Sequence, residues 1–198
     1  MAEHPNIVLF VAESYRGDVL GHHGNRAAVT PNLDAIVANG AVSYTNAFSQ
    51  SPVCSPSRCS FMTGCYPHVN GHRSMRNLLK DHEPHLLKSL RKEGYWVWWG
   101  GKNDLVALER SEDISRHCDV RNIIPKDYPA GEYKIPPISK DDPRYAVDYR
   151  GVADINADGE PFNQKDSINV QGAIDAISTH SGKKPFCIYL PLTLVHPP

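Results

Sequence analysis

A continuous β-branched and apolar run near the N-terminus, Ile7 to Ala12, constrains the fold of this chain more than any other feature. Such a run is typical of a strand that is covered on both faces in a parallel sheet, and we expect it to be the central strand. Two later runs, Tyr95 to Trp99 and Phe186 to Leu190, have the same character. Because helical patterns separate the runs, the sequence predicts an α/β sandwich with helices flanking a largely parallel sheet.

Helix signals lie between these runs: a capping residue before a proline, apolar residues at helical spacing, and a glycine stop. The predicted helices are 31–37, 56–63, 84–93 and 170–178. Ser55-Pro56 starts the second helix and Gly64 ends it, which places Cys54 just before a helix N-terminus. The positive end of the helix dipole lowers the pKa of a thiol and favours bound oxyanions.

The segment 104–165 differs from the rest of the chain. It holds prolines at positions 125, 129, 136, 137 and 143 and shows no clear hydrophobic period. Long connections without periodicity are uncommon in compact domains unless they serve a function. We therefore expect an irregular insertion over the edge of the sheet that helps to shape a pocket.

Polar residues follow each of the three predicted strands. Glu13-Ser14 follows the first, Gly101-Lys102 the second, and His196 lies in the loop after the third. Ligands of open parallel sheets bind beyond the carboxyl ends of the strands, so a carboxylate, an ammonium and an imidazole should meet at one edge. Each residue taken alone is better explained as a solvated loop residue, but their coincidence at three strand ends favours the functional interpretation.

The most informative segment is Cys54-Ser55-Pro56-Ser57-Arg58, followed by Thr63-Gly64. Its spacing is too short for a phosphatase cysteine loop, and the sequence has no Cys-x-x-Cys pair for zinc or redox chemistry. The segment resembles the C-x-P-S-R signature of the type I, formylglycine-dependent sulfatases. Other segments that resemble this family, in family order, are 6–12, 21–24, 66–68, Gly101-Lys102 and His196-Pro197.

This resemblance implies an alkaline-phosphatase-like fold and a sulfuric ester hydrolase. In the family, a formylglycine-generating enzyme oxidises the signature cysteine to formylglycine, whose hydrate is the nucleophile. By position, Cys54 would carry the modification and Arg58 would hold and polarise the hydrate. Lys102 would bind the sulfate oxygens, and His196 would bind sulfate or protonate the leaving oxygen. Fixed cations suit this reaction because negative charge develops on the sulfate oxygens.

The family site also contains a hard cation, here expected to be Ca²⁺ or alternatively Mg²⁺ or Mn²⁺. The expected ligands are Glu13, Ser14 and Cys54. The family usually places two acids after the first strand, so the neutral Ser14 is a departure and a weaker ligand. Asp104 stands where the family often has a histidine, and because an ionised acid donates no proton, leaving-group protonation would fall on His196.

The chain stops at Pro198, whereas family members continue with further site residues and a smaller subdomain. We therefore expect residues 1–198 to be the N-terminal part of the sulfatase catalytic domain, with the C-terminal remainder absent. Two alternatives stay open at this point. One is a phosphodiester or phosphonate monoester hydrolase of the same superfamily, and the other is a non-catalytic protein that binds sulfated ligands.

Charge and cysteine content restrict the partners. A net charge of -1 gives no field for a nucleic-acid backbone or an anionic membrane, and the longest apolar run is far too short to span a bilayer. The N-terminus lacks the pattern of a secretory signal, and five irregularly spaced cysteines form no disulfide framework, so we expect a cytoplasmic protein with reduced thiols. The expected substrate is a small-molecule or carbohydrate sulfate ester.

The remaining histidines are less informative. His72 is a candidate substrate contact, although surface placement explains it equally well. His22-His23 has the composition of a metal pair. Because adjacent histidines on a loop usually point apart, we expect these two to be solvated or to line a pocket.

Overall fold

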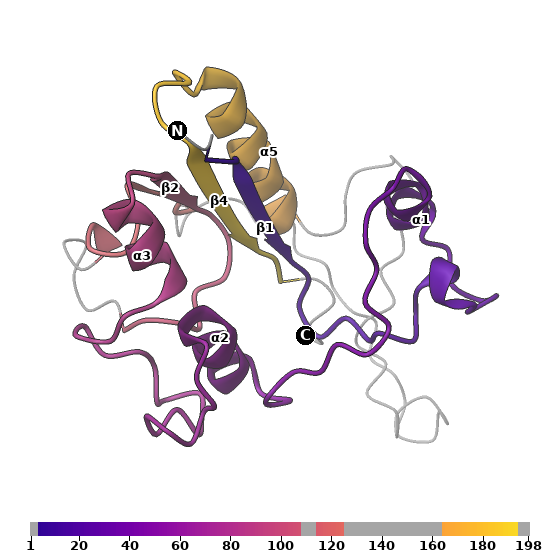
Figure 1. Cartoon of the computed structure of the whole chain (residues 1–198), viewed down its shortest axis with the longest axis horizontal. Helices are drawn as coiled ribbons and strands as arrows, with labels where there is room; N and C mark the ends of the chain where they lie inside the picture. The colour runs from indigo at the N-terminus through magenta and orange to yellow at the C-terminus, as the bar shows by residue number, and fades with distance from the viewer. Residues whose placement is uncertain (1–3, 108–113, 125–163, 194–198) are drawn as a thin grey trace.

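A computed structural model describes residues 4–107, 114–124 and 164–193. Its four strands form one sheet in the order β1-β4-β2-β3, and all neighbouring pairs are parallel (Figure 1). The strands are β1 (Ile7–Val11), β2 (Trp96–Trp99), β3 (Val120–Arg121) and β4 (Phe186–Pro191). The predicted parallel sheet is therefore confirmed.

Helices lie on both faces of this sheet. Figure 1 shows α5 on one side of β4 and β1, and α2 and α3 on the other. The helical elements are η1 (Gly21–His23), α1 (Pro31–Ala38), α2 (Cys54–Thr63), α3 (Leu86–Lys92) and α5 (Gln164–Thr179). None of the described helices has the length and apolar character that crossing a membrane requires.

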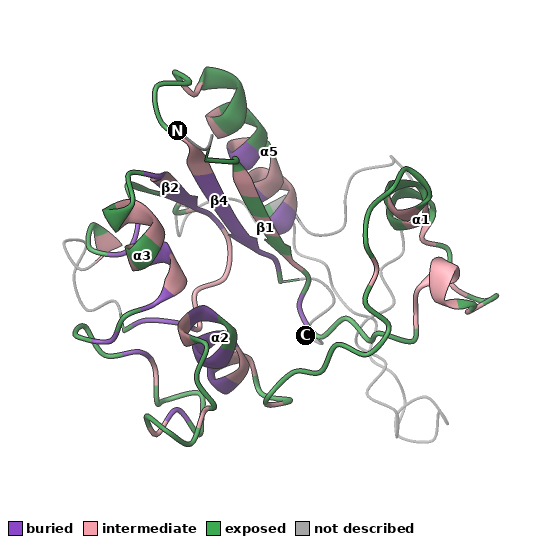
Figure 2. Cartoon of the chain, in the orientation of Figure 1, coloured by how far each residue is buried: buried purple, intermediate pink, exposed green. Residues whose placement is uncertain are grey.

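Two hydrophobic clusters attach the helices to the sheet, because successive residues of a strand point to opposite faces. On one face, Val97 and Trp99 of β2 pack with Leu87 of α3 in a fully buried cluster. On the other face, Trp98 packs with Ala173 of α5. The tryptophans of β2 thus serve packing, and Figure 2 shows that burial is concentrated in β2, β4 and α2.

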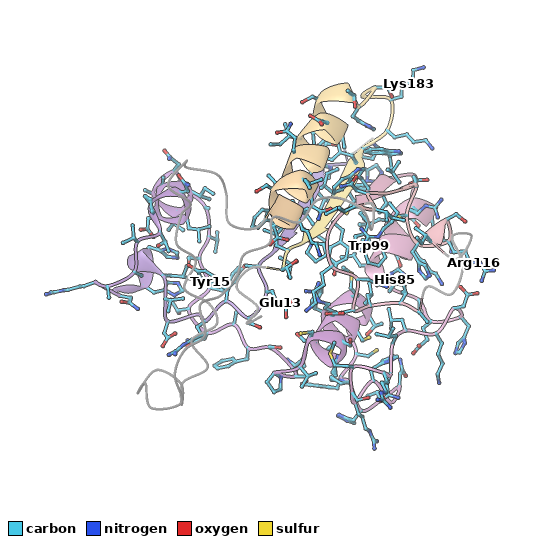
Figure 3. The ribbon with its side chains drawn as sticks, turned by 180° about the vertical axis from the view of Figure 1, so that it is seen from behind. Glu13, Tyr15, His85, Trp99, Arg116 and Lys183 are labelled. Carbon is cyan, nitrogen blue, oxygen red and sulfur yellow. The ribbon has the colours of Figure 1, made fainter. Side chains whose placement is uncertain are left out.

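A buried histidine pair links α3 to the segment before β3. His85 is 2% exposed, and its Nε2 lies 2.8 Å from Nδ1 of His117. Figure 3 labels His85 and Trp99 in this region of the core. Burial, together with the neighbouring His117 and Lys88, lowers the pKa of His85 to about 3. The ring of His85 is therefore neutral in the folded chain at ordinary pH.

Several boundaries differ from the prediction. Helix α2 begins at Cys54 and not at Pro56, because Val53 is extended and its carbonyl accepts the first helical hydrogen bond, from Ser57 N at 3.0 Å. Helix α5 begins at Gln164, within the segment predicted to be irregular. That segment also contains β3 and the buried Leu105 and Val106, whereas 108–113 and 125–163 lie outside the described residues.

The expectation that the first strand is central is wrong for the described sheet. Strand β4 is central, because it pairs with β1 on one side and with β2 on the other. Strand β1 is at the end of the sheet order, and its side chains alternate between half-buried and exposed. Val8 and Phe10 are 52% and 58% exposed.

Candidate active site

Charged and thiol side chains meet where β1 and β2 end and α2 begins. Glu13 follows β1 and is 4% exposed, Cys54 is the first residue of α2, and Arg58 lies one turn further along α2. Lys102 follows β2 and reaches the same place, with its Nζ 3.4 Å from Oε2 of Glu13. The predicted meeting of a carboxylate and an ammonium at the carboxyl edge of the sheet is confirmed.

Glu13 and Arg58 form a buried ion pair. Nη2 of Arg58 donates to Oε2 of Glu13 at 2.5 Å, and Nη1 donates to the hydroxyl of Tyr189 at 3.2 Å. Burial opposes ionisation of Glu13, but hydrogen bonds from Cys54 and Arg58 and the charges of Arg58 and Lys102 outweigh it. The pKa of Glu13 is therefore held below its ordinary value, and the carboxylate stays ionised.

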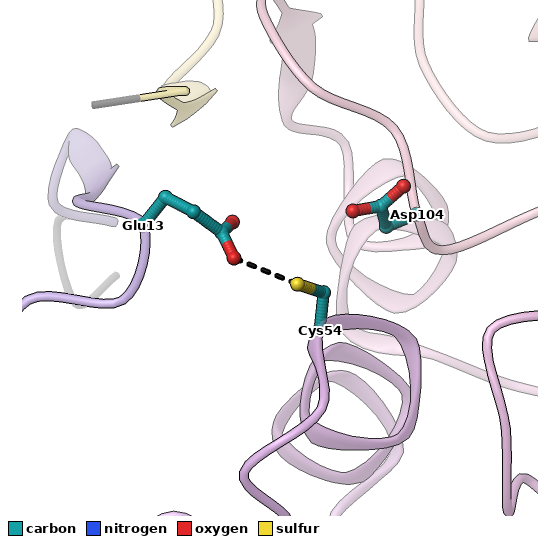
Figure 4. Close-up of side chains that lie close together, drawn as sticks. All are labelled: Glu13, Cys54 and Asp104. Atoms are coloured by element: carbon teal, nitrogen blue, oxygen red, sulfur yellow. Dashed lines mark hydrogen bonds between the residues drawn. The ribbon is translucent and has the colours of Figure 1, made fainter. Parts of the chain in front are cut away.

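The Cys54 thiol belongs to this cluster. Its Sγ donates a hydrogen bond to Oε1 of Glu13 at 2.7 Å and lies 3.6 Å from Nζ of Lys102 (Figure 4). Burial and the Glu13 carboxylate raise the pKa of this thiol. The predicted lowering by the helix N-terminus is wrong, because a buried carboxylate lies closer to the sulfur than any stabilising cation does. Cys54 is thus held as a protonated thiol.

Lys102 is shared between two acids. Its Nζ lies 2.9 Å from Oδ2 of Asp104 and 3.4 Å from Oε2 of Glu13. Burial opposes the ammonium charge, but the two carboxylates outweigh it and hold the pKa of Lys102 above its ordinary value. Asp104 has a left-handed backbone with φ of 45°, which aspartate tolerates better than most residues.

The backbone that carries Lys102 is fixed by close packing. Gly101 has φ of 81°, and a Cβ there would lie 2.0 Å from the carbonyl oxygen of Pro191. The same oxygen accepts a hydrogen bond from Lys102 N at 2.8 Å. Asn169 Oδ1 accepts from Gly101 N at 2.8 Å, and Arg121 Nη2 donates to the Gly101 carbonyl at 2.5 Å. Neither Asn169 nor Arg121 carries a sequence signal for this role.

The cluster also offers donors for a cation. Single ligand atoms of Glu13, Cys54 and Asp104 lie within 4.8 Å of one another (Figure 4). The two carboxylates are the oxygen donors that hard cations prefer, whereas a thiol sulfur suits them poorly. Asp104 was not among the predicted ligands. The predicted ligand Ser14 follows Glu13 directly, is exposed and has φ of 50°.

The two predicted histidines have different outcomes. His72 is 3% exposed, and both of its ring nitrogens have partners: Nδ1 lies 2.8 Å from the Asn77 carbonyl and Nε2 2.9 Å from Oε1 of Glu83. The alternative of surface placement is therefore wrong, and both ring nitrogens serve local packing, while the substrate contact stays a prediction. His196 lies outside the described residues.

Comparisons with known proteins agree with the motif. The sulfatase family profile matches residues 5–198. The ulvan-active sulfatase of Formosa agariphila is 39% identical over 107 residues, which are 54% of this chain and 21% of that protein. Arylsulfatase K of Danio rerio is 26% identical over 197 residues, which are 98% of this chain and 34% of that protein.

A solved structure shows the same fold. It is a protein in complex with its substrate D-glucosamine-2-N,6-O-disulfate, with a TM-score of 0.69 and 21% identity over 98% of this chain and 35% of that chain. The likeness confirms the predicted alkaline-phosphatase-like α/β fold. The chain spans about a third of the length of such relatives. By the match over residues 5–198, this chain belongs to the sulfatase family.

Proposed function

We propose that this chain carries the nucleophile and the main cations of a sulfatase active site, and that the protein hydrolyses sulfate esters. The observation that supports this proposal most strongly is the position of the signature at the start of α2. Cys54 contacts both Glu13 and Lys102, which come from the ends of two different strands. In this proposal, residues 1–198 form the N-terminal part of the sulfatase catalytic domain.

The proposed nucleophile is position 54 after oxidation of its thiol to formylglycine by a formylglycine-generating enzyme. When present and hydrated, this group supplies one hydroxyl that attacks sulfur and a second that later loses its proton as sulfate is expelled. Glu13 Oε1, 2.7 Å from the present Sγ, is in reach to accept a proton from an oxygen in that position. Arg58 holds this carboxylate in place through its buried ion pair.

Lys102 is the proposed electrostatic partner of the sulfate oxygens, and Arg58 is the proposed partner of the hydrate at position 54. The Lys102 ammonium lies 3.6 Å from Cys54 Sγ, so the oxygens of a sulfur atom bonded at position 54 come within its reach. Arg58 is 3% exposed and therefore fixed before any substrate binds. Prearranged cations stabilise the charge that develops on the sulfate oxygens without a reorganisation cost.

We propose that Glu13 and Asp104, with position 54 and Ser14 beside them, hold a hard cation such as Ca²⁺, or alternatively Mg²⁺ or Mn²⁺. The two carboxylates fit such an ion, and oxidation at position 54 would replace the poorly suited sulfur by oxygen. When bound, the ion supplies positive charge next to the nucleophile and the sulfate oxygens. Asp104 then contacts both the metal ion and the Lys102 ammonium. His196 is therefore the proposed proton donor to the oxygen of the leaving group.

The proposed substrate is a sulfated carbohydrate or another small sulfate ester. One structural relative was solved with a glucosamine disulfate as its substrate, and one sequence relative is named an ulvan-active sulfatase. Activity assays with sulfated carbohydrates and with other small sulfate esters test this substrate class.

Peptide mass spectrometry across Cys54, on the protein from its own cells, tests the nucleophile. We expect a conversion of the thiol to the aldehyde or its hydrate, turnover of an aryl sulfate, and loss of turnover in Cys54→Ala. Cys65→Ala is the matched control, because this thiol is exposed and outside the cluster. Faster turnover of an aryl phosphodiester would favour the phosphodiesterase alternative. Binding of sulfated ligands without sulfate release would contradict the proposal.

A further inference from the structure

His22 and His23 converge on one atom, contrary to the expectation that they point apart. Nε2 of His22 lies 3.0 Å and Nε2 of His23 lies 2.8 Å from Oγ of Ser43. The rings are arranged edge to face, with their centroids 4.4 Å apart. Both histidines belong to η1 and are half-buried.

The opposite ring nitrogens are held by acceptors. Nδ1 of His22 lies 3.0 Å from Oδ1 of Asp34, and Nδ1 of His23 lies 3.1 Å from the carbonyl oxygen of Gly17. A carboxylate and a carbonyl can only accept, so each Nδ1 carries the hydrogen. In the neutral rings, each Nε2 then presents an electron pair toward Ser43.

Asp34 is itself held in position. Its Oδ1 accepts a hydrogen bond from the Thr30 hydroxyl and another from the backbone N–H of His22, both at 3.0 Å. The side chain of His22 is 15% exposed, and that of Asp34 is 36% exposed. The orientation of the His22 ring is therefore fixed by its partners.

The two electron pairs exceed what Ser43 can satisfy. A serine hydroxyl has one hydrogen, so it can donate to only one of two neutral Nε2 atoms at a time. The other electron pair points at the same oxygen without a hydrogen between them. A cation at this point of convergence would accept both pairs and remove the mismatch.

We propose that His22 and His23 bind a divalent transition-metal ion, of the class of Zn²⁺ and Ni²⁺, through their Nε2 atoms. Imidazole suits these ions, whereas the carboxylates around Cys54 suit hard cations. Hydrogen bonds from the second ring nitrogen to a carboxylate or a carbonyl are the usual support of metal-binding histidines, and both are present here. Water completes the coordination. This proposal does not rest on the proposed sulfatase function.

Calorimetric titration of the untagged chain with NiCl₂ tests the proposal. All variants are made in the Cys54→Ala background, because this removes the thiol of the other candidate cluster. We expect one ion per chain. His22→Ala and His23→Ala should each weaken binding at least tenfold. Loss of a carboxylate that only supports a metal-binding histidine typically costs about 10–100-fold, and loss of the histidine itself should cost no less.

Two variants keep the result interpretable if the alanine variants disturb the turn. Asp34→Asn keeps the shape of the side chain and should weaken binding about 10–100-fold, because an amide supports the His22 ring less well. Ser43→Ala should keep the binding, because it removes only the competing hydroxyl. His82→Ala, which changes an exposed histidine elsewhere, is the control. Equal affinity in the background chain and in both histidine variants, or no binding at all, would overturn the proposal.

Discussion

Replacing Arg58 by methionine should destabilise the fold, because it leaves a buried carboxylate without its main counterion. Arg58 and Glu13 are 3% and 4% exposed, and the guanidinium donates to the carboxylate at 2.5 Å. Removing one partner of such a pair costs about 3–5 kcal/mol. Lys102 remains 3.4 Å from the same carboxylate oxygen, so we expect a loss near the lower end, about 3 kcal/mol.

Urea-induced unfolding followed by circular dichroism measures this loss. Arg58→Met keeps most of the side-chain volume, which limits any contribution from a cavity. The double variant Glu13→Gln/Arg58→Met removes both charges and should recover most of the lost stability. A loss below about 1 kcal/mol for Arg58→Met, or a double variant as unstable as the single one, would refute the buried-charge argument.

Two further predictions concern His85 and Gly101. Because the pKa of His85 is about 3 in the folded chain and about 6.5 for an unperturbed histidine, the unfolded chain takes up the proton first as the pH falls. The contribution of neutral His85 to the free energy of unfolding is complete above about pH 6.5, and about 2 kcal/mol of it is lost between pH 7.5 and 5. Urea titrations at these two pH values measure the loss, and His85→Gln should remove it. An unchanged loss in this variant would contradict the lowered pKa of His85. Gly101→Ala should lower the thermal midpoint of unfolding more than Gly64→Ala does. Both glycines have positive φ, but of the two only Gly101 would bring a Cβ against the backbone, 2.0 Å from the Pro191 carbonyl oxygen. Equal midpoints for the two variants would show that this carbonyl moves aside easily.

Elements with a strong local signal could be predicted from the sequence. The apolar runs gave β1, β2 and β4, and the residue pair Thr30-Pro31 marked the start of α1. The two-residue strand β3 has no such signal, because it exists only through its pairing with Trp98 and Trp99. The order of the strands is likewise a matter of long-range packing, which explains why β4 and not β1 is central.

The candidate site shows the same limit. The sequence indicated that Glu13 and Lys102 would meet, because both follow parallel strands. It did not indicate the state of the Cys54 thiol, because the helix dipole is a local property whereas the Glu13 carboxylate approaches from 41 residues away. For the same reason it left His72 open between a substrate contact and the surface, and it predicted that His22 and His23 point apart, since the direction of a ring depends on the partners that folding brings to it.

The position of β1 at the end of the sheet has a consequence for colloidal behaviour. Val8 and Phe10 are 52% and 58% exposed on a strand whose outer edge has no neighbour among the described strands. An apolar edge of this kind is a template for strand addition, which natural sheets usually block with charge or proline. Self-association of the chain should therefore start at this edge, and a lysine substituted for Phe10 should act there as a gatekeeper without touching the residues around Cys54.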